Sequence, residues 1–250
     1  IIRLKKETKM SKKLEEYKPN GYNASTGIYA SSYIFQGDWE NELDNLEYTP
    51  RGRDFKDVEG LDSSDDEKGL ITGYLFNSLK SQDGKSTTHD VLYEDFWTEN
   101  NPADFSWTDS YYNSPKLAAI LDWFKCETSQ IRVFQQNPGH HMPIHCDWDN
   151  QKGTEYGETV RIFLQLNDMP GGAWFHFKTA DSQVHINLQK GQFLIFNPDH
   201  TGHGTQNLTS IPRNTIMMVA KRNEWLDSLA NNETMTYINV DNLVEQKVAA

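Results

Sequence analysis

The chain has 250 residues, with 24 Lys and Arg against 36 Asp and Glu, which gives a formal net charge of −12 at pH 7. This acidic balance argues against nucleic acid as a partner, because phosphate recognition depends on clustered Lys and Arg. The sequence has no run of about 18 apolar residues, so we expect no membrane-spanning helix. Its two cysteines, Cys126 and Cys146, fit a reducing compartment, and we expect a cytoplasmic protein.

The chain divides near residue 128 into a polar first part and a strand-rich second part. Residues 1–9 are interpreted as a remnant upstream of a natural start at Met10. We expect residues 10–127 to form a polar, aromatic flanking region that packs on a core made by residues 128–222. Residues 223–250 would add a C-terminal helix and tail, so that the whole chain forms one structural domain.

The flanking region has weak periodicity. It offers a short helix within Trp39–Tyr48, a solvated acidic loop at Asp62–Lys68 and a strand at Gly73–Ser78. Its aromatic side chains suit either ordinary packing on the core or a lid over a substrate, with packing as the simpler interpretation. They are Tyr93, Phe96, Trp97, Phe105, Trp107, Tyr111 and Tyr112.

A helix is expected to begin after Ser114, which caps it, with Pro115 in its first turn and an apolar face that ends at Phe124. A second helix is expected at Trp225–Ala230. Between them, turn sequences such as NPG, NDMPGG and NPD separate eight short β-like runs. These runs are Ile131–Gln135, Met142–Trp148, Thr159–Leu166, Ala173–Phe177, Gln183–Leu188, Gln192–Phe196, Gly202–Gln206 and Asn214–Ala220. The pattern predicts a mainly β fold with flanking helices, built on a jelly-roll core.

Three side chains in the strand-rich part have the spacing of a metal site. His145 and Asp147 alternate on the second predicted strand, so they would project from the same face. His203 begins the seventh, and the second and seventh strands can be neighbours when two sheets roll up. Two His and one carboxylate bind a metal on one side and leave adjacent coordination positions open. His200 is the rival for the distal position.

Arg213 follows His203 by ten residues, at the start of the last predicted strand. A guanidinium group binds a carboxylate through two parallel hydrogen bonds, so Arg213 is a candidate partner for an acidic cosubstrate. Thr215, two residues further, would face the same side and could donate its hydroxyl.

These motifs resemble those of the Fe(II)/2-oxoglutarate-dependent oxygenases between Gln130 and Lys221. The segments NPGHHMPIHCDWD, VRIFLQLNDMPGGAWFHF and KGQFLIFNPDHTGH are similar to the prolyl 4-hydroxylases. The segment HGTQNLTSIPR is similar to the aspartyl/asparaginyl β-hydroxylases. Two departures stand out: Met142 replaces a cosubstrate-contacting Tyr common in prolyl hydroxylases, and the aspartyl hydroxylases lack the acidic ligand that Asp147 would supply.

The resemblance implies a double-stranded β-helix (a cupin-like jelly roll) that binds Fe(II) on His145, Asp147 and His203 and 2-oxoglutarate on Arg213. It also implies use of O₂, release of succinate and CO₂, and hydroxylation of an unactivated C–H bond. A protein or peptide side chain (Pro, Asp or Asn) is the expected substrate, and a free amino acid or another small metabolite is the alternative. Two competing hypotheses are a cupin-like metal enzyme without 2-oxoglutarate and a non-catalytic β-sandwich binding protein.

Overall fold

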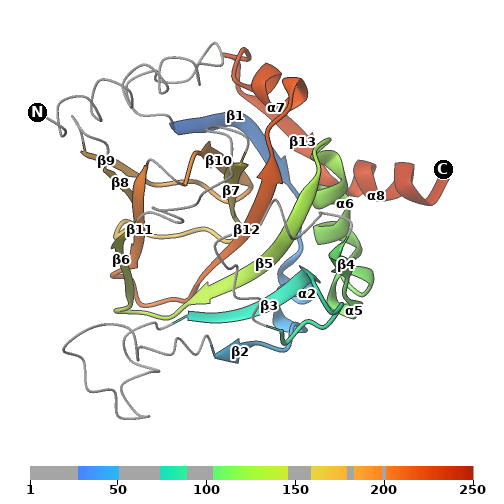
Figure 1. Ribbon diagram of the computed structural model, residues 1–250, viewed down its shortest axis with the longest axis horizontal. Helices are drawn as coiled ribbons and strands as arrows, with labels where there is room; N and C mark the ends of the chain where they lie inside the picture. Colours follow the sequence, from blue (N-terminus) through green and yellow to red (C-terminus); the bar gives the residue numbers. More distant parts are fainter. Residues whose placement is uncertain are drawn as a thin grey trace, which may run out of the picture.

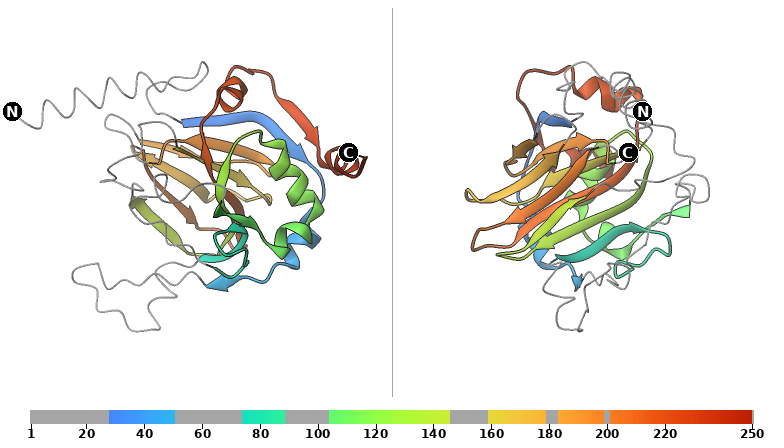
Figure 2. Two further views of the ribbon diagram at one scale, coloured as in Figure 1. Left: turned by 45° about the vertical axis from the view of Figure 1, so that its right-hand side comes forward. Right: turned by 60° about the vertical axis from the view of Figure 1, so that its left-hand side comes forward.

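The computed structural model describes residues 28–50, 74–88, 104–145, 159–178, 183–198 and 201–249. Within these ranges the strands form two sheets. The large sheet has the order β13-β1-β10-β7-β12-β5-β3-β2, with β4 paired to β3, and the small sheet has the order β6-β11-β8-β9. Figure 1 shows the small sheet on one side of the large sheet and helices α6 and α8 on the other, and the left view of Figure 2 agrees.

The strands of the large sheet are β1 (Ile28–Gln36), β2 (Thr49–Pro50), β3 (Tyr74–Ser81), β4 (Ser106–Trp107), β5 (Thr128–Gln136), β7 (Thr159–Gln165), β10 (Gln192–Phe196), β12 (Arg213–Lys221) and β13 (Thr236–Asn239). The small sheet contains β6 (His141–His145), β8 (Ala173–Lys178), β9 (Gln183–Ile186) and β11 (Gly202–Asn207). The helices are α2 (Glu40–Asp44), α5 (Asp109–Tyr112), α6 (Pro115–Trp123), α7 (Glu224–Leu229) and α8 (Val240–Ala249).

Strands β5 to β12 form the jelly roll that the sequence predicts. Along the chain, β5, β7, β10 and β12 lie in the large sheet, and β6, β8, β9 and β11 lie in the small one. Each of the eight predicted runs overlaps one of these strands, residues 146–148 of the second run lie outside the described residues, and the second and seventh strands, β6 and β11, pair antiparallel. The mainly β, double-stranded β-helix fold is therefore confirmed.

Alternation along the strands divides the apolar side chains between two sides of the large sheet. On β12, Ile216 and Met218 belong to the cluster that packs against α6 and α7, whereas Met217 and Val219 face the space between the sheets. Phe163 of β7 joins the two clusters of the inter-sheet space. The core thus has an outer layer under the helices and an inner layer that borders the site described below.

The flanking region differs from its predictions in two details. The helix expected at Trp39–Tyr48 is shorter in the structure, where α2 ends at Asp44. The chain becomes extended soon afterwards, and Thr49 and Pro50 pair with β3 as β2. Ser114 occupies the N-cap of α6 but makes no side-chain cap hydrogen bond. The Glu42 carboxylate accepts instead from the backbone N–H groups of Lys116 and Leu117, at 2.9 and 3.0 Å.

Among the aromatic residues expected to pack on the core, three of the four that the structure describes, Phe105, Trp107 and Tyr111, behave as packing residues, whereas Tyr112 is 67% exposed. Phe105 is buried in the inter-sheet cluster, and Trp107 stacks on Tyr111 at 4.0 Å between ring centroids. Tyr93, Phe96, Trp97 and the acidic segment 62–68 lie outside the described residues. Among the helices within the described ranges, none has the length and apolar character needed to cross a bilayer.

Candidate functional site

Two histidines meet at one end of the small sheet. His203 of β11 stands directly opposite His145 of β6 in the antiparallel register, and their ring centroids are 4.5 Å apart. His203 is only 6% exposed and packs on Phe196 of the large sheet at 4.8 Å between centroids. The pair therefore lies on the inner side of the small sheet, where a metal ion could bind both rings.

The backbone fixes how each of these two rings carries its proton. Nδ1 of His145 lies 2.8 Å from the Pro143 carbonyl, and Nδ1 of His203 lies 3.1 Å from the Thr201 carbonyl. A carbonyl oxygen only accepts, so each Nδ1 carries the hydrogen and the lone pair of each neutral ring is on Nε2. Hydrogen bonds of this kind orient metal-ligating histidines and set their tautomer, so the arrangement fits a metal held through two Nε2 atoms.

An irregularity in the pairing of β6 and β11 turns His145 toward the interior. His203 pairs with His145 and Thr205 pairs with Met142, so β6 has one more residue than β11 in this interval. Met142 and His145 consequently both face inward, although they are three positions apart. Gly204 permits the bulge, because a Cβ at this position would lie 2.6 Å from the Met142 carbonyl oxygen.

Asp147, the expected carboxylate ligand, and His200, the rival of His203 for the distal position, lie outside the described residues. Within the described ranges, no group of three or more His, Cys, Asp or Glu side chains could hold a metal. The structure thus brings together two of the three expected ligands, and the assignment of Asp147 stays a prediction.

Arg213 lies at the start of β12 and is 3% exposed. Its Nε donates to Oε1 of Gln165 at 3.0 Å, its Nη1 donates to the Trp174 carbonyl at 3.3 Å, and its Cζ lies 3.9 Å from the Phe175 ring centroid. Burial lowers the pKa of Arg213 to about 10, so the group stays protonated at neutral pH. Among the described residues no Asp or Glu forms an ion pair with it. A buried cation of this kind is suited to an anionic ligand.

Thr215, Tyr74 and Thr205 also line the inter-sheet space. Thr215 is buried two positions from Arg213 on the same face of β12. The hydroxyl groups of Tyr74, on β3, and Thr205, on β11, are hydrogen-bonded to each other. Tyr74 packs in the same cluster as Met142. Met142 is the residue that stands where prolyl hydroxylases commonly have Tyr. The sequence pattern gave no indication that Tyr74 belongs to the site, because β3 pairs with a strand, β5, that lies much further along the chain.

A second pair of histidines lies on the opposite face of the small sheet. His176 of β8 and His185 of β9 pair in register, with 2.6 Å between their Nδ1 atoms. Their strand neighbours Phe175 and Ile186 face the inter-sheet cluster, so the two histidines point away from the site. One Nδ1 must donate to the other, and Gln183 contacts Nε2 of His185 at 3.3 Å. Ordinary strand positions account for both residues.

The second pair should make stability depend on pH. Burial, and then the neighbouring His185, lower the pKa of His176, so its neutral form is favoured in the folded state. Below about pH 6.5, His176 becomes protonated in the unfolded chain before it does so in the folded protein. The free energy of unfolding therefore decreases as the pH falls from this value to the lowered pKa of the folded state. Wild type should therefore lose more stability than His176→Gln between about pH 7.5 and 5.5, as measured by urea denaturation midpoints. Equal losses in the two proteins, with the exposed His141→Gln as control, would contradict this expectation.

No family model matches the sequence, and no curated protein is significantly similar to it. Among solved structures, the chain is similar to a prolyl-4-hydroxylase of Pseudomonas putida, at 12% identity over 85% of this chain and 98% of that one, with a TM-score of 0.47. It is also similar to a Trichoplax adhaerens prolyl hydroxylase in complex with a hypoxia inducible factor peptide fragment, at 10% identity over 92% and 96% of the two chains, with a TM-score of 0.48. HygX from Streptomyces hygroscopicus, with nickel and 2-oxoglutarate bound, gives 12% identity over 80% and 84%, with a TM-score of 0.45. At such identities, activity and substrate must be inferred from the residues themselves.

Proposed function

We propose that the chain is an Fe(II)- and 2-oxoglutarate-dependent dioxygenase that hydroxylates an unactivated C–H bond. The observation that carries the proposal is the combination, in one inter-sheet space, of two facing histidines with a buried arginine that forms no ion pair with a described residue. His145 and His203 have their lone pairs on Nε2, and no described carboxylate neutralises Arg213. A site of this kind suits a metal at one end and an anion at the other.

Fe(II) would be held by His145, Asp147 and His203. Bound there, it would supply O₂ activation coupled to the oxidative decarboxylation of 2-oxoglutarate to succinate and CO₂. The carbonyl groups of Pro143 and Thr201 hold the two imidazoles in the tautomer that has the hydrogen on Nδ1 and leaves Nε2 free to bind a metal. Phe196, against which His203 packs, would help to keep water away from the bound metal.

The distal carboxylate of 2-oxoglutarate would bind to Arg213, with Thr215 as a further donor. The guanidinium of Arg213 lies over the ring of Phe175 on β8. Phe175 pairs with Thr205 on β11, and Thr205 is two residues from the proposed metal ligand His203. Two strand positions correspond to about 7 Å, which a five-carbon diacid bound to both a metal and an arginine can span. Tyr74 and Thr205 place two further hydroxyl groups near this position.

We propose a protein or peptide side chain (Pro, Asp or Asn) as the substrate. This choice is supported by the resemblance of Asn137–Asp149 to prolyl hydroxylases and of His203–Arg213 to aspartyl/asparaginyl hydroxylases. Incubation with extract of the source cells, followed by a search for peptides heavier by one oxygen, tests the proposal. Oxygen added only to small metabolites would favour the alternative substrate class.

Alanine substitution of the histidines separates the metal ligands from their neighbours. His203→Ala is expected to weaken metal binding more than about 100-fold, because even hydrogen-bonding partners of metal ligands contribute 10- to 100-fold. His200→Ala should leave metal affinity close to wild type. Metal content after dialysis against Fe(II) under anaerobic conditions measures both. The reverse result would make His200 the distal ligand, whereas unchanged binding in His145→Ala, Asp147→Ala and His203→Ala would overturn the site.

A further inference from the structure

Two neutral amide side chains at the end of β7 hold Arg213 and the backbone on either side of it. Gln165 accepts from Arg213 Nε at 3.0 Å and donates to the Asn214 carbonyl at 3.2 Å. Asn167 donates to the Pro212 carbonyl at 2.9 Å and accepts from the Asn214 N–H at 2.8 Å. Gln165 and Asn167 also bind each other, at 3.1 and 3.2 Å. We call these two residues the amide clamp.

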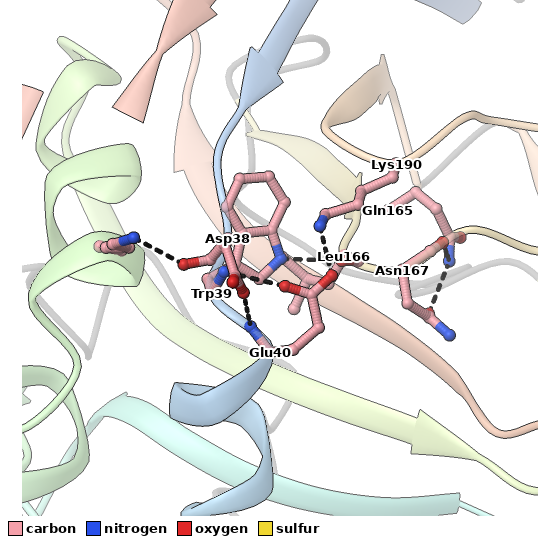
Figure 3. Close-up of polar contacts among 8 residues, drawn as sticks. Asp38, Trp39, Glu40, Gln165, Leu166, Asn167 and Lys190 are labelled. Carbon is pink, nitrogen blue, oxygen red and sulfur yellow. Dashed lines mark hydrogen bonds and ion pairs between the residues drawn. The ribbon is translucent and has the colours of Figure 1, made fainter. Parts of the chain in front are cut away.

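Figure 3 shows the polar contacts that surround the amide clamp. The indole N–H of Trp39 donates to the Leu166 carbonyl at 2.8 Å, and Trp39 is fully buried. Lys190 lies over the Trp39 ring at 4.7 Å and pairs with Glu40. The backbone of Gln165 accepts from the Gly191 N–H at 2.8 Å. The backbone of Gln165 and Leu166 is therefore held by the turn before β10 and by Trp39, the N-cap residue of α2.

The chemistry of the amide clamp preserves the charge of Arg213. A glutamate at position 165 would have nearly the same shape as Gln165 and would form an ion pair with Arg213 Nε. The amide oxygen accepts the same hydrogen bond without neutralising the cation. The other contacts of the guanidinium among the described residues, a carbonyl oxygen and an aromatic ring, carry no net charge either. The positive charge is thus held in place by neutral groups in a buried position, where electrostatic attraction is strong.

We propose that Gln165, supported by Asn167, is a positioning residue that makes the site select 2-oxo acids with a distal carboxylate. Gln165 fixes the direction of the guanidinium and keeps its charge for the ligand. The inference rests on the proposed function, because the ligand is the cosubstrate assigned there. It adds a residue that binds neither metal nor substrate yet determines which cosubstrate is accepted.

The test compares 2-oxoglutarate with 2-oxopentanoate, which has the same chelating group and chain length but no distal carboxylate. Apparent Kd values are obtained from the visible charge-transfer band of the Fe(II) protein without O₂, so no turnover is needed. Wild type should prefer 2-oxoglutarate by about 30-fold or more, the effect of a buried charge pair. Gln165→Glu should reduce this preference at least about tenfold by weakening 2-oxoglutarate alone, because the new carboxylate competes for Arg213. Gln165→Met, which adds no charge, should weaken 2-oxoglutarate less.

Gln135→Glu is the matched control. Gln135 lies on β5 opposite Asn214, and its neighbours Val133 and Ile131 face the outer cluster, so the same added charge lies on the other side of the sheet. The preference of Gln135→Glu for 2-oxoglutarate over 2-oxopentanoate should equal that of wild type. An unchanged preference in both Gln165 variants, with wild type still selective, would overturn the role of Gln165 alone. A wild-type protein that binds both acids equally would overturn the role of Arg213 and the proposed function with it.

Discussion

Arg213→Met is expected to raise the 2-oxoglutarate concentration for half-saturation by about 30-fold to several thousand-fold, with Fe(II) binding retained. Removing one partner of a buried, hydrogen-bonded charge pair costs roughly 2–5 kcal/mol, largely because the other charge stays buried and unpaired. Arg213 is 3% exposed and its described partners are neutral, so the ligand carboxylate would lose its counter-charge entirely. The charge-transfer titration and a separate metal-binding measurement give the two quantities.

Arg222→Met is the control for loss of an arginine. Arg222 forms an ion pair with Asp227 at 2.8 Å near the surface, and its removal should leave the 2-oxoglutarate requirement unchanged. If Arg213→Met binds 2-oxoglutarate as tightly as wild type, Arg213 is not the carboxylate partner.

Gly191→Ala is expected to destabilise the protein by about 2–6 kcal/mol. Gly191 has a φ of +79°, and a Cβ there would lie 1.9 Å from the Phe35 carbonyl oxygen. A non-glycine residue in this backbone region costs about 1–3 kcal/mol, and forcing extra atoms into a packed position costs about 1–3 kcal/mol more. Gly191 also connects β1 to β7, since it accepts from the Phe35 N–H and donates to the Gln165 carbonyl. The free energy of unfolding in urea measures the loss.

Gly139→Ala separates the two causes of this loss. Gly139 also has a φ of +79°, but no atom lies within 4 Å of its added Cβ. Its cost should be the backbone component alone, about 1–3 kcal/mol. Equal losses at the two glycines would show that the contact with Phe35 contributes nothing.

The strands of the jelly roll could be predicted because each carries its own signal. On β12, alternate residues face the helices and the inter-sheet space, and short polar turn sequences, several of them with Gly or Pro, separate the runs. Strands β1 and β13 carry no such signal. β1 pairs with β10 through Ile28 and Phe196, and β13 pairs in parallel with β1. Their positions depend on partners far away in the sequence, which alternation within a segment does not reveal.

Part of the candidate site could also be predicted from the sequence. The sequence indicated that the strands of His145 and His203 could be neighbours and that Arg213 lies at the start of the last strand, and the structure has both features. Gln165 and Tyr74 could not be assigned in this way. The hydrogen bond of Gln165 to Arg213 spans 48 residues, and that of Tyr74 to Thr205 spans 131. Each depends on which side chains the register places together, and an isolated Gln or Tyr in a sequence gives no such information.

Anaerobic titration with Fe(II) and 2-oxoglutarate tests the central claim most directly. If His145, Asp147 and His203 hold the metal and Arg213 binds the cosubstrate, a weak visible charge-transfer band should appear only when both are added. Metal binding that is indifferent to 2-oxoglutarate would contradict the claim and favour a cupin-like enzyme without this cosubstrate. Absence of any metal uptake would contradict it as well and favour a non-catalytic binding protein.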